Sequence, residues 1–227
     1  MIISINEEGG TIQQLSYLQD ISPINIPGMY YVGKTNNTKL AYNVGKILAQ
    51  KLRTLGINVI YAPVVDINSN PNNIRLGIRS FGADSKLVSK MALSLTEGLE
   101  NNGVIATIKH FPGHGDTIIN SNSPFPIVNK TYNQIENEEL VPFEDAIKHN
   151  VKLIMVAHIA LPNLTGNNTP ASLSKEIITD LLKTKMNYKG LIITDSLTRN
   201  NLINTYTEEQ ICLLYTSPSP RDRQKSR

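Results

Sequence analysis

Imidazole, ammonium and carboxylate groups are concentrated in residues 109–117, which read KHFPGHGDT. A proline and two glycines within this stretch prevent it from forming a helix, so it is predicted to be a loop. It follows residues 104–108, a short apolar and β-branched run that indicates a buried strand. Because ligands gather at the carboxyl ends of parallel strands, Lys109 and His110 are predicted to lie in a pocket.

Strand-like and helix-like segments alternate along the chain. Asp84 and Ser174 are expected to cap helices at their N-termini, and Gly56, Gly103 and Gly190 to end helices in the left-handed conformation. Repeated strand–helix units indicate a parallel sheet, either in an open doubly wound fold or in a (β/α)8 barrel. The strands are expected at residues 1–5, 57–65, 104–108, 153–157 and 191–194, and the helices at 38–55, 84–102, 135–149 and 174–186.

Polar residues follow every predicted strand, at residues 6–10, Asp66, residues 109–110, His158 and Asp195. An open sheet concentrates its site at one switch point, whereas a barrel draws on most strand ends. The fold class is therefore predicted to be α/β, a (β/α)8 TIM-type barrel. The predicted strands are fewer than eight, so the barrel is expected to be incomplete.

Composition and charge limit the kinds of partner that the chain is expected to bind. At 227 residues and 40% hydrophobic, the chain can bury a core of one or two domains. No apolar run approaches the roughly 20 residues of a membrane span, and no glycine-rich nucleotide motif occurs, so neither a membrane partner nor a cofactor is expected. The net charge of +3 comes from the basic residues of 215–227, which leaves the preceding chain neutral. A nucleic-acid partner is therefore not expected.

The last residues differ in composition from the rest. Residues 212–227 abandon the alternation of strands and helices and are expected to be a non-native-looking or disordered basic tail. Residues 1–203 are expected to form the partial barrel. The single cysteine, Cys212, excludes an internal disulfide. The compartment stays open: a cytoplasmic location is favoured, and secretion is compatible with an N-terminus that looks truncated.

Several short motifs occur in order along residues 1–203, and together they carry a family resemblance. They are Glu8-Gly9-Gly10, residues 62–67 (APVVDI), 77–82 (GIRSFG), 109–117, 155–158 (MVAH), 170–174 (PASLS) and 190–197 (GLIITDSL). With these motifs the chain resembles the N-terminal catalytic barrel of glycoside hydrolase family 3, especially its bacterial β-N-acetylhexosaminidase branch, which acts in peptidoglycan recycling. Relative to that family, the chain looks incomplete at both ends of the barrel.

The resemblance implies an activity and a site. Asp195 would be the nucleophile of a retaining hydrolase that forms a covalent glycosyl-enzyme intermediate. Arg79, Lys109 and His110 would bind the sugar, and His158 would line the same pocket. The partner would be a small carbohydrate, terminal β-linked N-acetylglucosamine from cell-wall-derived sugars.

The residue types alone leave other roles open. Asp195 can simply cap the segment that follows it, although no cation adjacent in sequence neutralises it. Arg79 can form a surface ion pair, and His110 can be a hydrogen-bonded core histidine. His110 and His114 are not expected to bind a metal, because the proline and glycine between them prevent the helix that would place both on one face.

The chain departs from the family at the general acid/base. Where this branch has Asp-Ser-His, the chain has Asn120-Ser121-Asn122, and neither amide titrates. We therefore expect impaired hydrolysis, with His114 and Asp116 as the nearest surrogates. The alternative is a non-catalytic sugar-binding protein or an inactive fragment.

Two sugar-binding positions also differ from the family. Asn6 replaces an aspartate and Gln14 replaces an arginine. Both replacements keep hydrogen-bonding groups and lose charge, so Asn6 and Gln14 are expected to bind substrate through neutral amides.

Overall fold

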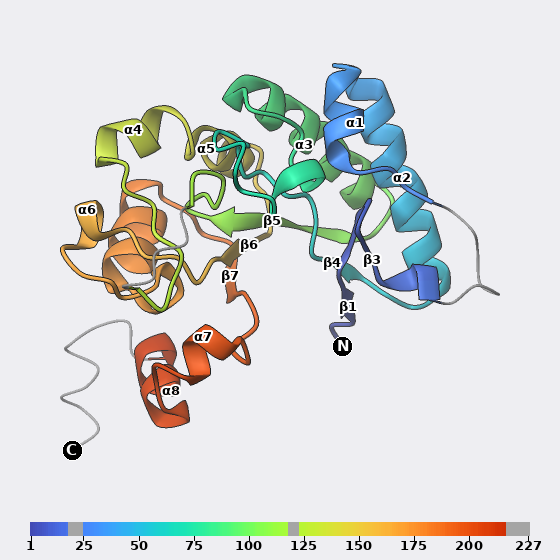
Figure 1. Ribbon diagram of the computed structural model, residues 1–227. Coiled ribbons are helices and arrows are strands. Elements are labelled where there is room, and N and C mark those ends of the chain that lie inside the picture. Colours follow the sequence, from blue (N-terminus) through green and yellow to red (C-terminus); the bar gives the residue numbers. More distant parts are fainter. Residues whose placement is uncertain (18–24, 118–122, 217–227) are drawn as a thin grey trace.

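The computed structural model describes residues 1–17, 25–117 and 123–216. Its centre is a 5-stranded sheet in which every pairing is parallel, in the order β1-β4-β5-β6-β7. The spatial order follows the chain order, and the helices lie around the sheet (Figure 1). This arrangement confirms the predicted α/β fold, an incomplete TIM-type barrel. The strands are β1 (Ser4–Ile5), β4 (Val59–Ile60), β5 (Ile105–Phe111), β6 (Leu153–Val156) and β7 (Leu191–Thr194).

The strand predicted at residues 57–65 forms the much shorter β4. The chain beyond it still runs beside β5, because the Thr107 N–H donates to Ala62 O at 2.9 Å and the Val65 N–H donates to Lys109 O at 2.8 Å. Pro63 lies within this run and has no N–H to contribute to a regular ladder. The backbone hydrogen bonds therefore deliver Asp66 to the same end of the sheet as Lys109.

A hairpin that the sequence did not predict follows β1. It pairs β2 (Glu7–Gly9) with β3 (Ile12–Gln13) in antiparallel orientation. Gly9 at the end of β2 and Gly10 in the turn have φ of +91° and +59°, values that other residues rarely adopt. The hairpin places the buried Glu8 side chain beside β5.

The helices differ from expectation mainly between residues 135 and 149. The single helix predicted there is two, because Pro142 lies at the start of a new helix where its missing N–H costs nothing. The segment 174–186 is helical as predicted, with π-type hydrogen bonding. The helices are α1 (Met29–Lys34), α2 (Thr38–Thr54), α3 (Ser85–Glu100), α4 (Tyr132–Asn137), α5 (Val141–Lys148), α6 (Pro162–Thr165), η4 (Glu176–Lys185), α7 (Asn200–Ile203) and α8 (Glu208–Thr216), with single 3₁₀ turns at η1 (Gln14–Tyr17), η2 (Gly77–Arg79) and η3 (Ala171–Leu173).

Both predicted N-caps are confirmed. Asp84 Oδ1 accepts the Leu87 N–H at 2.7 Å, and Ser174 Oγ accepts the Ile177 N–H at 3.3 Å.

Two of the three predicted glycine caps are confirmed. Gly56 and Gly103 have φ of +74° and +83°, whereas the cap predicted at Gly190 is wrong, since Asn187 takes the left-handed conformation with φ of +56°. Gly190 is needed for space instead, because a Cβ there would lie 2.3 Å from the Tyr188 hydroxyl oxygen.

The chain stays helical past Cys212, within α8. Ile211 of this helix and Leu202 of α7 are buried in a small apolar cluster with Phe125. Residues 217–227, most of the expected tail, lie outside the described residues. Across 1–17, 25–117 and 123–216, no helix is long and apolar enough to cross a membrane.

Candidate functional site

The carboxyl ends of the parallel strands surround a cleft of about 1300 Å³. Its lining includes a polar side chain from the carboxyl end of each strand, within the strand or just after it, as the barrel geometry predicts. These side chains are Asn6 after β1, Asp66 after β4, Lys109 and His110 within β5, His158 after β6 and Asp195 after β7. Arg79, Gln14 and His114 also line the cleft. The structure thus brings together all but one of the predicted site residues.

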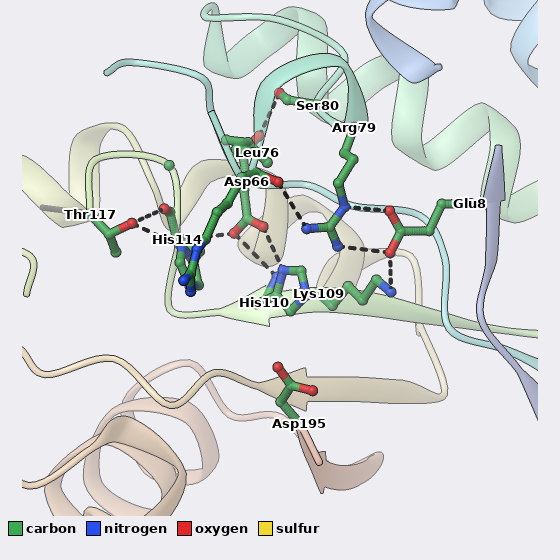
Figure 2. Close-up of polar contacts among 12 residues, drawn as sticks. Glu8, Asp66, Leu76, Arg79, Ser80, Lys109, His110, His114, Thr117 and Asp195 are labelled. Carbon is green, nitrogen blue, oxygen red and sulfur yellow. Dashed lines mark hydrogen bonds and ion pairs between the residues drawn. The ribbon is translucent and has the colours of Figure 1, made fainter. Parts of the chain in front are cut away.

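One wall of the cleft is a charged cluster centred on Glu8. Arg79 donates to both Glu8 oxygens, from Nε at 2.7 Å and from a terminal nitrogen at 2.8 Å, and Lys109 Nζ lies 2.5 Å from Glu8 Oε1 (Figure 2). Burial raises the pKa of Glu8, but Arg79 and Lys109 outweigh it and hold that pKa below its ordinary value. Burial lowers the pKa of Lys109, although the Glu8 charge opposes this. The cluster therefore holds an ionised carboxylate between two basic side chains, and it presents fixed N–H donors suited to sugar hydroxyls.

The second wall is organised by Asp66, which is completely buried. Its Oδ2 lies 2.6 Å from His110 Nδ1, and its Oδ1 accepts the backbone N–H groups of His110 at 3.2 Å and His114 at 2.7 Å (Figure 2). Burial raises the pKa of Asp66, but the neighbouring His110 and the His114 N–H reverse this and lower it to about 2. One carboxylate therefore orients the His110 ring and holds the start of the loop.

The rest of the loop is held by Asn73. Its amide nitrogen donates to His114 O at 2.9 Å, to Gly115 O at 3.0 Å and to Thr117 Oγ1 at 3.2 Å. Gly115 lies so close to the Asp66 segment that a Cβ would meet Ile67 O at 1.6 Å. The loop is thus fixed to the β4–α3 connection, which explains why this position is a glycine.

The two candidate surrogates for the acid/base lie in different surroundings. His114 lines the cleft, and its Nδ1 is 3.0 Å from Thr117 Oγ1. Burial lowers the pKa of His114 despite the nearby Asp66 charge. Asp116 is outside the cleft lining, with an oxygen 4.0 Å from Lys130 Nζ. Asn120 and Asn122, which replace the family's Asp and His, lie outside the described residues.

Asp195 lies at the end of β7 and points toward His110 (Figure 2). Its Oδ1 accepts the Ser196 N–H at 2.7 Å, and Arg199 approaches its oxygens at 3.3 and 3.4 Å. Burial raises the pKa of Asp195, but His110, the Ser196 N–H and Arg199 together lower it below its ordinary value. The carboxylate is therefore ionised at neutral pH, as a nucleophile must be.

Arg199 qualifies one expectation from the sequence. No cation is adjacent to Asp195 in the chain, yet Arg199 reaches it from four residues further on, across the turn that precedes α7. The Arg199 side chain is 61% exposed, so this pair is screened by solvent and easily opened.

Asn6 and Gln14 contact each other through the hairpin. The Asn6 N–H donates to Gln14 Oε1 at 3.2 Å, and Asn6 Oδ1 accepts from Lys109 Nζ at 3.3 Å. These neutral side chains extend the Glu8 cluster along the cleft without adding charge.

Asp66 makes the stability of the protein depend on acid. Its pKa is about 2 when folded and close to 3.8 when exposed, so its contribution is complete above about pH 4 and is lost as the pH falls through 2. We expect the free energy of unfolding to fall by about 2 kcal/mol between pH 4 and pH 2 from this group. Urea unfolding at several pH values measures it. Asp66→Asn should flatten the slope in that window, and an unchanged slope would contradict the assignment.

Sequence reasoning named no role for Glu8, Asp66, Asn73 or Arg199. The available signals were the position of Glu8 inside a family motif and of Asp66 after a predicted strand. Within the described part of the chain, no group of three or more His, Cys, Asp or Glu side chains is placed to hold a metal ion.

Known proteins resemble this chain both in sequence and in architecture. The chain is 36% identical over 212 residues to beta-hexosaminidase A of Pseudoalteromonas piscicida and covers 35% of that protein. It is 30% identical over 203 residues to beta-hexosaminidase of Nitrosomonas eutropha and covers 56% of it. These matches include 87% of the present chain, which spans about a third to over half of the length of these relatives.

Solved structures agree. A glycoside hydrolase family 3 beta-N-acetylglucosaminidase from a Paenibacillus species superposes with a TM-score of 0.89 at 34% identity, over 96% of this chain and 41% of that one. NagZ from Neisseria gonorrhoeae in complex with N-trifluoroacetyl-D-glucosamine gives a TM-score of 0.82 at 26% identity, over 96% and 62%. The model of the glycosyl hydrolase family 3 N-terminal domain matches residues 1–214, almost the whole described chain and every side chain of the cleft, so the protein belongs to that family.

Proposed function

We propose that this chain carries the catalytic domain of a retaining β-N-acetylhexosaminidase. It would cleave terminal β-linked N-acetylglucosamine from cell-wall-derived sugars. The observation that carries the proposal is the ionised Asp195 carboxylate, which points toward His110 in a cleft whose opposite wall holds Arg79 and Lys109 (Figure 2). The relatives named beta-hexosaminidase and beta-N-acetylglucosaminidase support the sugar.

In this proposal each group has a step. Arg79, Lys109 and His110 hold the sugar hydroxyls and place the anomeric carbon beside Asp195. A carboxylate oxygen of Asp195 attacks that carbon, the bond to the leaving oxygen breaks, and a covalent glycosyl-enzyme forms. Water then attacks the same carbon, releases Asp195 and gives the sugar with retained configuration. Oδ2 would be the attacking atom, because Oδ1 accepts the Ser196 N–H at 2.7 Å, whereas Oδ2 is approached at 3.3 Å by the exposed Arg199.

The leaving oxygen must receive a proton in the first step, and water must lose one in the second. Asn120 and Asn122 can do neither, and Asp116 is outside the cleft lining. His114 is the titratable side chain of the loop that reaches the cleft. With its pKa lowered by burial, it is neutral at pH 7 and is better suited to accept the proton from water than to supply one.

We therefore expect the first step to depend steeply on the leaving group. Natural glycosides, whose leaving oxygen needs a proton, should react about 10²–10⁴-fold more slowly than in an enzyme with a working general acid. Glycosides of acidic phenols should be much less affected. A plot of log kcat/KM against leaving-group pKa tests this, and a flat plot would show that a general acid is present.

The proposed activity itself is tested by trapping the intermediate. A ring-fluorinated N-acetylglucosaminyl fluoride needs no protonation to leave, so folded protein should gain one glycosyl unit on the peptide that contains Asp195. Intact mass and peptide mapping report the adduct. Cooperative unfolding of the same sample shows that it is folded. A folded protein that binds N-acetylglucosamine and forms no adduct would instead be a sugar-binding protein, the alternative favoured by the two asparagines.

A further inference from the structure

His158 makes two hydrogen bonds, and both are to the protein. Its side chain is buried, with Nδ1 2.6 Å from Ser172 Oγ and Nε2 3.0 Å from Ser196 O. A carbonyl oxygen only accepts, so Nε2 must carry a hydrogen. Burial lowers the pKa of His158, which favours the neutral ring, so Nδ1 accepts from the Ser172 hydroxyl. The tautomer is thus set by the Ser196 carbonyl, and the fully buried Ser172 hydroxyl matches it by donating to Nδ1.

Ser196 connects this histidine to the nucleophile. Its carbonyl accepts from His158, while its N–H donates to Asp195 Oδ1 at 2.7 Å. The Asp195 N–H in turn donates to Val156 O at 2.9 Å. The turn that carries Asp195 is therefore attached at two points to the end of β6 and the residues just beyond it.

The attachment matters because of where Asp195 lies. In the described chain β7 is an edge strand that pairs only with β6, and Leu191 at its start is 65% exposed. The other contact of the carboxylate is the exposed Arg199, which imposes little order. The orientation of Asp195 thus depends on its backbone hydrogen bonds, including the one that His158 fixes.

We propose that His158 is a positioning residue for the Asp195 nucleophile, with the Ser196 carbonyl fixing its tautomer and Ser172 holding Nδ1, and is not a ligand of the sugar. The proposal rests on the proposed function, because it assigns Asp195 the attack. It differs from the substrate-binding role expected from the sequence, since both ring nitrogens already have protein partners. The sugar is left to Arg79, Lys109 and His110.

Two conservative replacements of His158 distinguish the contribution of its Nε2 contact with Ser196 from that of its Nδ1 contact with Ser172. The amide nitrogen of His158→Gln reaches about as far as Nε2 and can still donate to Ser196 O. The amide of His158→Asn reaches only as far as Nδ1, so it can meet Ser172 but not Ser196. His158→Leu removes both contacts and keeps an apolar side chain. Each variant is assayed for the rate of Asp195 labelling at saturating fluoride and for the dissociation constant of N-acetylglucosamine.

We expect His158→Gln to label within about 5-fold of the native rate, and His158→Asn and His158→Leu to label roughly 10²-fold more slowly, because misplacing a reacting group by about 1 Å costs that much. Sugar affinity should stay within about 2-fold in all three. Native labelling rates in His158→Asn and His158→Leu would overturn the proposal. So would weakened sugar affinity with an unchanged labelling rate, which would make His158 a sugar ligand.

A second measurement does not depend on activity. The ¹⁵N chemical shifts of His158 in the native protein report its tautomer, and we expect hydrogen on Nε2 at neutral pH. Ser172→Ala should change the Nδ1 shift and slow labelling by about 10-fold, the value of one lost hydrogen bond. Hydrogen on Nδ1 in the native protein would overturn the proposal even if labelling succeeds. If the native protein forms no adduct, the proposed function fails, while the tautomer still decides whether His158 holds the Asp195 turn.

Discussion

Replacing Asp195 with alanine is expected to reduce turnover of 4-nitrophenyl N-acetyl-β-glucosaminide by roughly 10⁴-fold or more, because no covalent intermediate can form without the carboxylate. The phenolate of this substrate leaves without protonation, so the proposed lack of a general acid would not hide the effect. Initial rates of nitrophenolate release, with protein concentration corrected for the folded fraction, measure the loss.

Azide makes the test stereochemical. In Asp195→Ala the space vacated by the carboxylate admits azide, which attacks the anomeric carbon directly and gives the α-glycosyl azide. In the native protein azide can only attack the glycosyl-enzyme, and two inversions give the β-glycosyl azide. Recovery of the α-azide from the variant would therefore identify the face that Asp195 occupies.

Asp180→Asn is the matched control. It also removes a carboxylate, but Asp180 is on the surface, paired with Lys175 and 54% exposed. Its activity should stay within about 2-fold of native, as for most surface changes. If Asp195→Ala keeps a tenth or more of native turnover, the nucleophile must be another carboxylate of the cleft, Glu8 or Asp66.

The architecture could be read from the sequence because its signals are local. Buried strands show as short apolar runs, and alternation with helices leaves few topologies. The details that were wrong depend on the surroundings. Pro142 breaks a helical pattern but can equally begin a helix, and only packing decides which. Asn187 and Gly190 can both end a helix; Asn187 takes the left-handed conformation, and Gly190 is required by the nearby Tyr188 ring instead.

The sequence predicts that the polar residues at the strand ends lie close together, but it does not predict which of them pair. Parallel strands end at the same edge, so polar residues after each strand had to meet. Which side chain pairs with which is a long-range matter: Glu8 and Arg79 are 71 residues apart, and Asp66 and His110 are 44 apart. His114 and Asp116 were equivalent acid/base candidates in the sequence. In the structure His114 lines the cleft and contacts Thr117, whereas Asp116 lies outside the cleft lining, near Lys130.

The contact between Arg199 and Asp195 could not be predicted from the sequence either. The distance of Arg199 along the chain gives no sign that it reaches Asp195, yet the non-helical turn between them brings the guanidinium to the carboxylate. Sequence patterns therefore identify where charged groups gather, whereas their ionisation and orientation follow from partners that only the folded chain supplies.

The charged cluster carries the second large effect, which concerns stability. Glu8→Gln is expected to destabilise the protein by about 3–5 kcal/mol, because it leaves the Lys109 ammonium, 2% exposed, without its carboxylate. Denaturant unfolding measures the loss. Asp180→Asn again serves as control, since an exposed pair contributes only about 0–1 kcal/mol. A loss below 1 kcal/mol for Glu8→Gln would contradict the burial of an uncompensated charge.

A double variant distinguishes stabilisation from function in this cluster. Combining Glu8→Gln with Lys109→Met removes the orphaned ammonium, so the pair should be more stable than Glu8→Gln alone. Affinity for N-acetylglucosamine should not recover with it, because the Lys109 donor is gone and Arg79 has lost the carboxylate that orients it. Recovery of stability without affinity would show that the buried charges serve ligand binding and do not stabilise the fold. Recovery of both would assign sugar binding to His110 and the amides of Asn6 and Gln14.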